Sequence, residues 1–145
     1  MISSIGARIA PPGAGIYYAS NAAVSSFAMS LAMELEPFGI KVTAVELGGM
    51  RTRFAEASSL NVAEFDPAYD PTVGATFAMM QSENYSSMLS DPKGHAALVI
   101  KVAEMDEPPV RILAGVDAFT YGTQFDAVRA AMDAKYETLS RLAAL

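Results

Sequence analysis

The chain contains no cysteine and no tryptophan, and His95 is its single histidine. Without cysteine it can form no disulfide framework and offers no thiolate to a metal ion. One imidazole is also too few for a zinc centre built from histidines. We therefore expect no metal site in this protein.

Basic residues are scarce as well, with ten Lys and Arg against sixteen Asp and Glu and a formal net charge of −6. Nucleic-acid binding depends on clustered Lys and Arg that neutralise phosphates, so we expect no such partner. No apolar run approaches the ~18 residues of a membrane span, because Lys101 interrupts the densest one, at 96–103. Residues 1–16 lack the basic start and apolar run of a secretory signal. We expect a cytoplasmic protein that does not bind a membrane.

Apolar residues, in contrast, are abundant. Hydrophobic residues make up 52% of the sequence and charged residues 18%, whereas soluble domains usually have ~45–50% and ~25%. The mean hydropathy is +0.25. A chain of 145 residues has room for one domain. This composition excludes a disordered chain and indicates more apolar surface than a self-contained domain of this size needs.

The first third of the chain has the pattern of one strand–helix repeat. Met1–Ile5 is typical of the end of a buried strand, and a loop rich in proline and glycine follows at 6–15. The spacing then predicts a helix over Tyr17–Glu36, and the β-branched segment Lys41–Leu47 predicts the next strand. The apolar residues of that helix recur every four positions, at Ala23, Phe27, Leu31 and Leu35. A helix and a short turn between two such strands are typical of a parallel α/β sheet.

The rest of the chain predicts an insert and a further helix–strand–helix unit. Residues 53–90 are rich in Phe, Met and Tyr and are predicted to form a flexible, partly helical insert. The pattern then predicts a helix over Ala96–Met105, a strand over Val110–Ala114 and a long helix over Ala118–Leu145. One face of the last helix is apolar and comprises Phe125, Val128, Met132, Tyr136 and Leu139.

Three Asp-Pro pairs begin at Asp66, Asp70 and Asp91. Each fits a helix N-cap followed by proline at the first helical position. A carboxylate metal cluster is the alternative, and we favour capping by roughly ten to one because Asp is a strongly preferred N-cap. His95 falls in the first turns of the helix after Asp91. There we expect a surface or half-buried histidine rather than a catalytic one.

The hydroxyl of Ser4 and the phenol of Tyr17 can lie beside one substrate atom. Ser4 ends the first predicted strand, Tyr17 follows thirteen residues later at the start of the helix, and Asn21 shares the helix face of Tyr17. Functional loops of parallel sheets lie at the carboxyl ends of the strands, so Ser4 and Gly48–Thr52 should face the same crevice. Taken singly, these residues also fit plain structural roles: a turn former, a helix-start aromatic and, for Thr52, an N-cap.

The order of these residues resembles the second half of a short-chain dehydrogenase/reductase. That family has a Ser in an S-S-x-x-G turn, then Tyr-x-x-x-Lys opening a long helix, then Pro-Gly-x-x-x-Thr after the next strand. Ser4, Tyr17, Gly48 and Thr52 match these motifs in order within ISSIGARIAPPGAGIYYASNAAVSSFAMSLAMELEPFGIKVTAVELGGMRT. The segment DPKGHAALVIKVAEMDEPPVRILAGVDAF also resembles the family's penultimate helix and last strand.

The resemblance implies the C-terminal half of a doubly wound, Rossmann-type α/β domain with an incomplete parallel sheet. Residues 1–145 would form this single partial domain, with 53–90 as the substrate loop. The implied activity is that of an oxidoreductase that moves a hydride between NAD or NADP and an alcohol or carbonyl. Tyr17 would be the general acid/base, and Ser4 would hold the substrate oxygen. The residues facing the cofactor would be Asn21, Leu47, Gly48 and Thr52.

Two substitutions depart from the family pattern. Asn21 stands where the family has lysine, so the site lacks a cation that would stabilise a phenolate ~4 Å away by ~1 kcal/mol in water and ~4 kcal/mol at an effective dielectric of 20. We expect activity to be lower by orders of magnitude, or absent. Leu47 replaces the family's proline, which is a milder change because backbone contacts there can survive.

The glycine-rich turn that cradles a dinucleotide is also absent before Ser4. A parallel sheet without its first strands leaves strand edges and helix faces uncovered. We therefore expect a poorly soluble chain that forms homo-oligomers or binds a complementary N-terminal half.

Two alternatives to an active enzyme stay open: an inactive remnant that acts only through association and, with less support, a module that binds apolar ligands. If the chain is an enzyme, its insert suggests a small apolar alcohol or carbonyl compound as substrate, although packing onto the body explains the same residues equally well. The residues concerned are Phe54, Leu60, Phe65, Tyr69, Phe77, Met79, Met80, Tyr85 and Met88.

Overall fold

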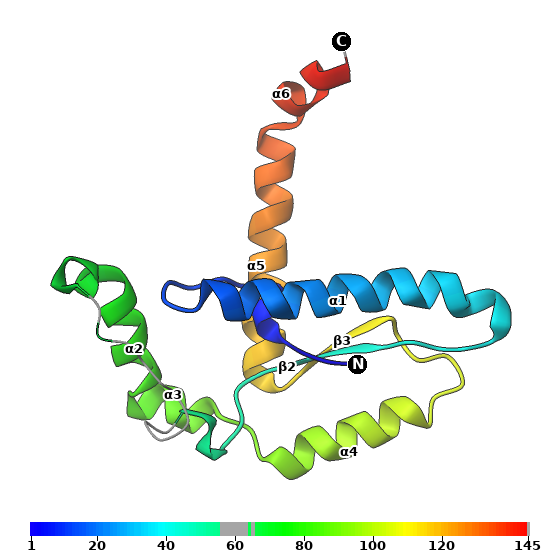
Figure 1. Cartoon of the computed structure of the whole chain (residues 1–145), viewed down its shortest axis with the longest axis horizontal. Coiled ribbons are helices and arrows are strands. Elements are labelled where there is room, and N and C mark those ends of the chain that lie inside the picture. The colour runs from blue at the N-terminus through cyan, green and yellow to red at the C-terminus, as the bar shows by residue number, and fades with distance from the viewer. Residues whose placement is uncertain (56–63, 65, 145) are drawn as a thin grey trace.

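A parallel three-stranded sheet forms the centre of the computed structural model, which describes residues 1–55, 64 and 66–144. The strands lie in the order β1 (Ile2–Ser4), β2 (Ala44–Leu47) and β3 (Arg111–Ala114). Helices pack around this sheet (Figure 1). The predicted parallel α/β architecture is confirmed.

The three strands end level with one another. Ser4 pairs with Leu47, and Leu47 pairs with Ala114. The central strand β2 is shorter than the predicted Lys41–Leu47, because the hydrogen bonds of Thr43 are not part of the regular strand pairing. Its carbonyl accepts a hydrogen bond from the Met1 ammonium at 2.6 Å, and its hydroxyl donates to the Pro109 carbonyl at 2.7 Å. Because the three strands end level with one another, the residues that follow them start from one end of the sheet.

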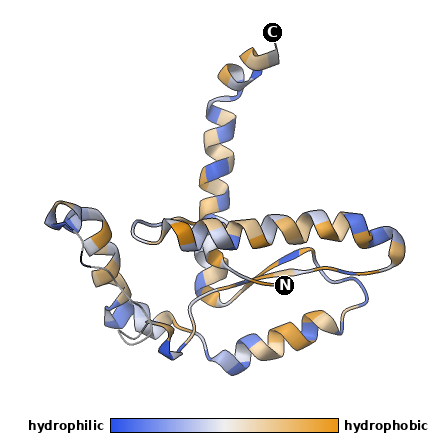
Figure 2. Cartoon of the chain, in the orientation of Figure 1, coloured by the Kyte–Doolittle hydropathy of each residue, from blue (hydrophilic) through white to orange (hydrophobic). Residues whose placement is uncertain are grey.

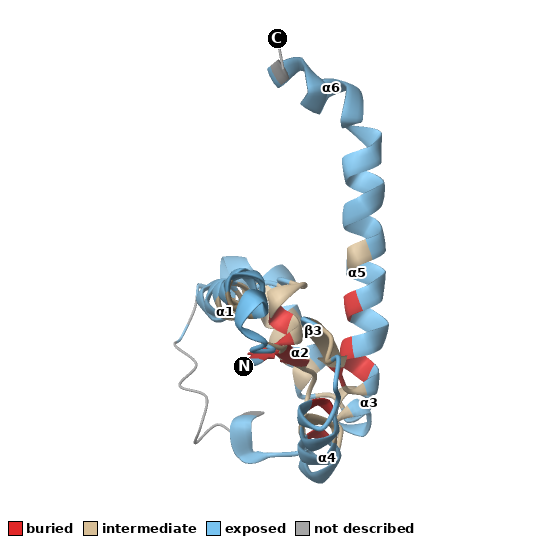
Figure 3. Ribbon diagram, turned by 90° about the vertical axis from the view of Figure 1, so that its right-hand side faces the viewer, coloured by how far each residue is buried: buried red, intermediate tan, exposed pale blue. Residues whose placement is uncertain are grey.

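Helices α1 (Gly15–Leu35) and α4 (Pro92–Ala103) lie on opposite sides of the strands in Figures 1 and 3. Helix α1 begins slightly earlier than predicted, soon after Gly13 turns the chain with a φ of +102°. Helix α4 also begins earlier, because the Asp91 carboxylate caps it by accepting from the Lys93 N–H at 2.8 Å. A 3-10 turn, η2 (Glu36–Phe38), and Gly39 end α1 as the sequence predicted.

The single C-terminal helix predicted over Ala118–Leu145 is interrupted. The structure has α5 (Val116–Lys135), α6 (Glu137–Arg141) and a 3-10 turn, η6 (Leu142–Ala144). The break falls at Tyr136, whose φ of −106° and ψ of 12° are not helical. Long helices in proteins are stabilised mainly by packing, and α5 rises away from the body with exposed residues along its outer half (Figure 3). Nothing in the described chain therefore enforces a continuous helix there.

The insert is partly helical, as predicted. Its described elements are η3 (Arg53–Ala55), η4 (Pro67–Tyr69), the π-turn η5 (Asp70–Gly74), α2 (Ala75–Met80) and α3 (Glu83–Met88). Leu60 and Phe65 lie outside the described residues. Asp66 caps η4 by accepting from the Ala68 N–H at 2.8 Å. The prediction that Asp70 is also an N-cap is wrong, because η4 runs directly into η5 and Asp70 is already helical.

The interior of the molecule is small and unusually polar. Its buried apolar residues are Ala28, Ala44, Val45, Val102, Ala114 and Ala118. The buried polar residues are Ser3, Ser4, Ser25, Glu46, His95 and Asp117. Many larger apolar side chains are exposed. Figure 2 shows hydrophobic segments in orange along the helices.

Glu46 on the central strand is fully buried. Its Oε1 accepts from Arg111 Nη2 at 2.6 Å and from the Ser25 hydroxyl at 2.9 Å, and its Oε2 accepts from Arg8 Nε. Arg8 also forms an ion pair with Asp126 on α5. This network, which we call the Glu46 network, joins the loop after β1, helix α1 and strand β3 to the centre of the sheet.

Among the described helices, none combines the length and the apolar character needed to cross a membrane.

Candidate active site

The site assembles at the shared end of the three strands. Ser4 ends β1, the loop Gly48–Thr52 follows β2, and Gly115 follows β3 into α5. The pairing of Ser4 with Leu47 and of Leu47 with Ala114 makes these segments neighbours. The structure thus brings Ser4 and the glycine loop to one edge, as the sequence predicted.

Ser4 is buried and caps the first turn after its strand. Its hydroxyl oxygen accepts from the Gly6 N–H at 3.1 Å, at the start of the 3-10 turn η1 (Ile5–Ala7). The ring of Tyr18 packs on this turn, since a Cβ added to Gly6 would lie 2.7 Å from the Tyr18 ring. A hydroxyl that accepts one hydrogen bond can still donate its own proton to a substrate oxygen.

Tyr17 lies in the first turn of α1 and is 41% exposed. Its ring contacts Tyr18 edge-on, with centroids 5.6 Å apart, and lies 6.2 Å from the ring of Phe54 in the insert. Within the described part of the chain, no hydrogen bond joins the Tyr17 phenol to Ser4. The structure thus places Ser4 and Tyr17 without a direct contact between their hydroxyl groups among the described interactions.

Asn21 lies one helical turn beyond Tyr17, as predicted, but its side chain turns back onto its own helix. The amide donates to the Tyr17 carbonyl at 2.9 Å. The backbone carbonyl of Asn21 accepts a hydrogen bond from the Ser3 hydroxyl at 3.0 Å. The amide brings no positive charge to the phenol.

The loop Gly48–Thr52 is held by hydrogen bonds on several sides. Gly48 N–H donates to the Ala114 carbonyl at 2.8 Å, and Gly49 N–H donates to Asp117 Oδ2 at 2.7 Å. The Ser90 N–H donates to the Gly49 carbonyl at 3.0 Å, which ties the end of the insert to the loop. The Thr52 hydroxyl accepts from the Phe54 N–H at 3.3 Å, the contact expected of the N-cap alternative.

Two further tyrosines line this region. Burial raises the pKa of Tyr18, and the neighbouring Tyr17 and Tyr85 raise it further. Burial also raises the pKa of Tyr85, and the negative charge of Asp117 adds to this effect. These shifts stabilise the protonated phenols. Tyr18 and Asp117 were not predicted as site residues, although the Gly48-Gly49 pair signals that another group approaches the backbone closely there.

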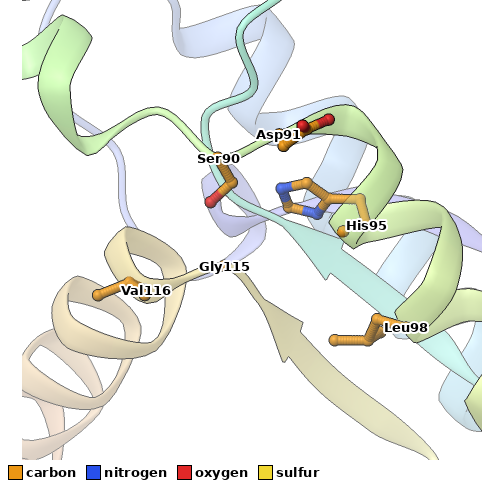
Figure 4. A pocket seen from close by; sticks show the side chains of 7 residues that line it. Ser90, Asp91, His95, Leu98, Gly115 and Val116 are labelled. Carbon is orange, nitrogen blue, oxygen red and sulfur yellow. The ribbon is translucent and has the colours of Figure 1, made fainter.

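His95 is buried, with 6% of its surface exposed, so the prediction of a surface or half-buried histidine is wrong. It packs beside Gly115, where a Cβ would lie 3.4 Å from its ring, and the missing side chain makes room for it. Neither ring nitrogen has a hydrogen-bond partner in the part of the chain that the structure describes. The ring borders a pocket of about 210 Å³ that Ser90, Leu98 and Val116 also line (Figure 4).

No three Asp, Glu or His side chains of residues 1–55, 64 and 66–144 lie close enough together to hold a metal ion.

Comparisons with known proteins identify relatives over nearly the whole chain. Residues 1–63 match the family model described as short chain dehydrogenase. Oxidoreductase BOA17 from Botryotinia fuckeliana is 41% identical over 139 residues, which is 96% of this chain and 50% of that protein. A 3-ketodihydrosphingosine reductase from Bacteroides thetaiotaomicron is 30% identical over 117 residues, covering 79% of this chain and 42% of the reductase.

A solved structure shows the same relationship in three dimensions. The short-chain dehydrogenase from Streptomyces avermitilis superposes with a TM-score of 0.78 and 34% sequence identity, over 97% of this chain and 50% of that one. The match confirms a Rossmann-type arrangement of the strands and helices. The chain spans about half the length of the curated relatives named above.

Proposed function

Because this chain belongs to the short-chain dehydrogenase/reductase family, we propose that it supplies the substrate-facing part of an NAD(P)-dependent oxidoreductase. The observation that carries the proposal is the meeting of Ser4, the Tyr17 helix and the Gly48–Thr52 loop at one end of the sheet. Loops at the carboxyl ends of parallel strands are where such sheets bind their ligands.

The residues fit the nicotinamide end of a dinucleotide. The strand pairing and the hydrogen bond from the Gly49 N–H to Asp117 fix the Gly48–Thr52 loop, whose backbone would bind the nicotinamide. When bound, the dinucleotide would supply or accept the hydride. In such folds a glycine-rich strand–turn–helix unit holds the pyrophosphate, and we propose that a complementary N-terminal half supplies it.

The chain's own residues would bind the substrate oxygen and transfer the proton. Ser4 donates a hydrogen bond to that oxygen and keeps it in place. Tyr17 gives its phenolic proton to the oxygen when a carbonyl is reduced and takes a proton back when an alcohol is oxidised. Thr52 and the backbone at Leu47 and Gly48 hold the nicotinamide amide, and Asn21 offers a neutral amide to a ribose hydroxyl.

The exposed apolar side chains of the insert support an apolar substrate. Phe54, whose ring lies 6.2 Å from that of Tyr17, and Met79 are more than half exposed, and Met88 is 39% exposed. An apolar alcohol or ketone would cover these side chains. The name of the Bacteroides relative describes the reductase of a ketone, which supports the same class.

A partner is needed for the uncovered faces of the chain. Ile16, Phe27 and Met33 on α1 are exposed by 88%, 59% and 69%. Strand β1 is an edge strand of the sheet, and parallel strands are normally paired and covered. We propose a second copy of this chain or a complementary N-terminal half as the partner.

Reduced nicotinamide mononucleotide tests the proposal on the chain itself, since this ligand lacks the adenosine phosphate. We expect saturable binding, with the largest NMR shift changes at the Gly48–Thr52 amides. No binding, or binding with shift changes elsewhere, would contradict the proposal.

Asn21→Lys tests the catalytic part. The added charge should increase the rate of NADH- or NADPH-dependent carbonyl reduction by roughly tenfold or more, because a cation ~4 Å from the phenolate contributes ~1–4 kcal/mol and ~1.4 kcal/mol is tenfold in rate. Gln124→Lys, on the exposed surface of α5, adds the same charge away from the site and should leave the rate unchanged.

An inactive remnant that acts only through association is the second candidate. The neutral Asn21, whose amide is engaged by its own helix, and the exposed apolar face of α1 favour it. Absence of turnover in both wild type and Asn21→Lys, with intact self-association, would support this candidate.

A further inference from the structure

One carboxylate accounts for two glycines at the end of the sheet, whereas the atom nearest to a Cβ added at Gly49 is Leu89 Cδ2, at 2.5 Å. A Cβ added to Gly48 would lie 2.2 Å from Asp117 Oδ1, and one added to Gly115 would lie 2.8 Å from the same oxygen. At Gly49 the added atom would lie 3.4 Å from Oδ2. The distances at Gly48 and Gly115 are too short for any side chain. The backbone at these two positions is therefore packed directly onto Asp117.

One oxygen of the Asp117 carboxylate is hydrogen-bonded to the loop, and the other, Oδ1, is buried without a hydrogen-bond partner among the described residues. Asp117 is only 9% exposed, and its Oδ2 accepts from the Gly49 N–H at 2.7 Å. Hydrogen bonds of this kind to an ionised acceptor are about twice as strong as neutral ones. Asp117 also lies in the first turn of α5, where the helix dipole favours negative charge. The N-cap of this helix is Gly115, which has no side chain of its own to cap the turn.

The same loop is held on its other side by the insert. Gly49 carbonyl accepts from the Ser90 N–H, and the Arg51 N–H donates to the Ser90 carbonyl, each at 3.0 Å. The peptide groups of Gly49 are therefore set by two anchors, the carboxylate of α5 and the backbone at Ser90. Of these, Asp117 is the one that acts through a side chain, so a substitution can remove it.

We infer that Asp117 is a positioning residue, which fixes the Gly48–Thr52 loop in the orientation that receives the nicotinamide. This inference rests on the proposed function for the role of the loop, but the anchoring itself does not. Asp117 touches the loop and not the ligand. Its loss frees the Gly49 N–H and lets the loop take other orientations.

The test compares Asp117→Ala and Asp117→Asn with Asp133→Ala, an exposed aspartate on the same helix. Amide hydrogen exchange is measured first, without ligand. Exchange at Gly49 should be at least about tenfold faster in Asp117→Ala and unchanged in Asp133→Ala. The asparagine variant keeps an acceptor oxygen and should lie between them. If the alanine variant fails to fold, exchange at Gly49 is compared between Asp117→Asn and the wild type. Unchanged exchange at Gly49 would overturn the inference.

Binding of reduced nicotinamide mononucleotide is measured next. The dissociation constant should rise by about tenfold to a hundredfold in Asp117→Ala, and less in Asp117→Asn. Equal affinities in wild type and both Asp117 variants would overturn the positioning role. If the wild-type chain does not bind, the proposed function fails, and the exchange result alone decides whether Asp117 anchors the loop.

Discussion

The centre of the sheet and the outer half of α5 differ in what they bury. Glu46 lies fully buried in the central strand, with Arg8, Arg111 and Ser25 as partners. On α5, Phe125, Val128 and Met132 are exposed by 44%, 56% and 51%. Figure 3 shows the contrast between the red segments of the body and the pale blue helix. The Glu46 carboxylate is thus satisfied within the described chain, whereas the apolar side chains on the outer half of α5 are not covered.

This difference shows what a partner has to supply. Ion pairs and hydrogen bonds hold the strands in register without help from outside the chain. The apolar faces gain free energy only when another surface covers them, by about 1.5–3 kcal/mol for each fully covered large side chain. We therefore expect substitutions in the Glu46 network to act on folding and substitutions on α5 to act on association.

Glu46→Gln should have the largest effect. The amide keeps the shape of the side chain but leaves Arg8 and Arg111 without their buried countercharge, and breaking such a pair usually destabilises a protein by about 3–5 kcal/mol. Because domains are stable by only about 5–15 kcal/mol, the urea midpoint followed by circular dichroism should fall steeply. Glu104→Gln, on the exposed end of α4, is the control. Equal midpoints for the two variants would show that the network does not stabilise the sheet.

Phe125→Glu combined with Met132→Lys should have an intermediate effect, on association rather than on folding. Each substitution removes an exposed apolar side chain from α5 and replaces it with a charge that a partner surface would have to desolvate. Sedimentation velocity should show a shift toward smaller species, while the circular dichroism spectrum stays the same. Gln124→Glu on the same helix serves as the control. An unchanged distribution of species would remove α5 as an association surface.

Tyr85→Phe should have the smallest effect, confined to alkaline pH. Burial and Asp117 raise the pKa of Tyr85 in the folded chain, whereas the unfolded phenol has its ordinary value of ~10. The unfolded state therefore loses this proton first, so stability is fully present below pH ~10 and falls as the pH rises from there through the folded pKa. Urea midpoints at about pH 8 to 11 should fall less in Tyr85→Phe than in wild type or in Tyr69→Phe, a substitution at an exposed tyrosine. Parallel falls in all three proteins would contradict this assignment.

Local patterns in the sequence located most of the secondary structure. The apolar spacing in Ala23–Leu35 and the following proline place α1 nearly at its observed bounds, and the β-branched residues before Gly48 place β2. The C-terminal helix was predicted to be longer than α5 is, because apolar periodicity indicates an apolar helix face whether or not another element packs against that face. The break at Tyr136 depends on that missing neighbour, which no local pattern reveals.

The site was predicted where it depends on order along the chain and missed where it depends on packing. The order of the strands places Ser4 and Gly48 at one edge of the sheet, since parallel strands place their carboxyl ends together. Asp117 lies 68 residues from its partner Gly49, and only the folded chain brings them together. Glu46 in an otherwise apolar strand was a usable hint, because a charge at such a position requires a partner of opposite sign.

The glycines around Asp117 restrict the order in which this part of the sequence can change. Alanine at Gly48 collides with the carboxylate as long as Asp117 is present, whereas a shorter residue at 117 would first open the space that alanine needs. Gly48→Ala should therefore be much less harmful in an Asp117→Ala background than in the wild type, a non-additive coupling of residues in contact. A lineage that lost this carboxylate would be free to lose the Gly48 requirement afterwards, but the reverse order would pass through a damaged protein.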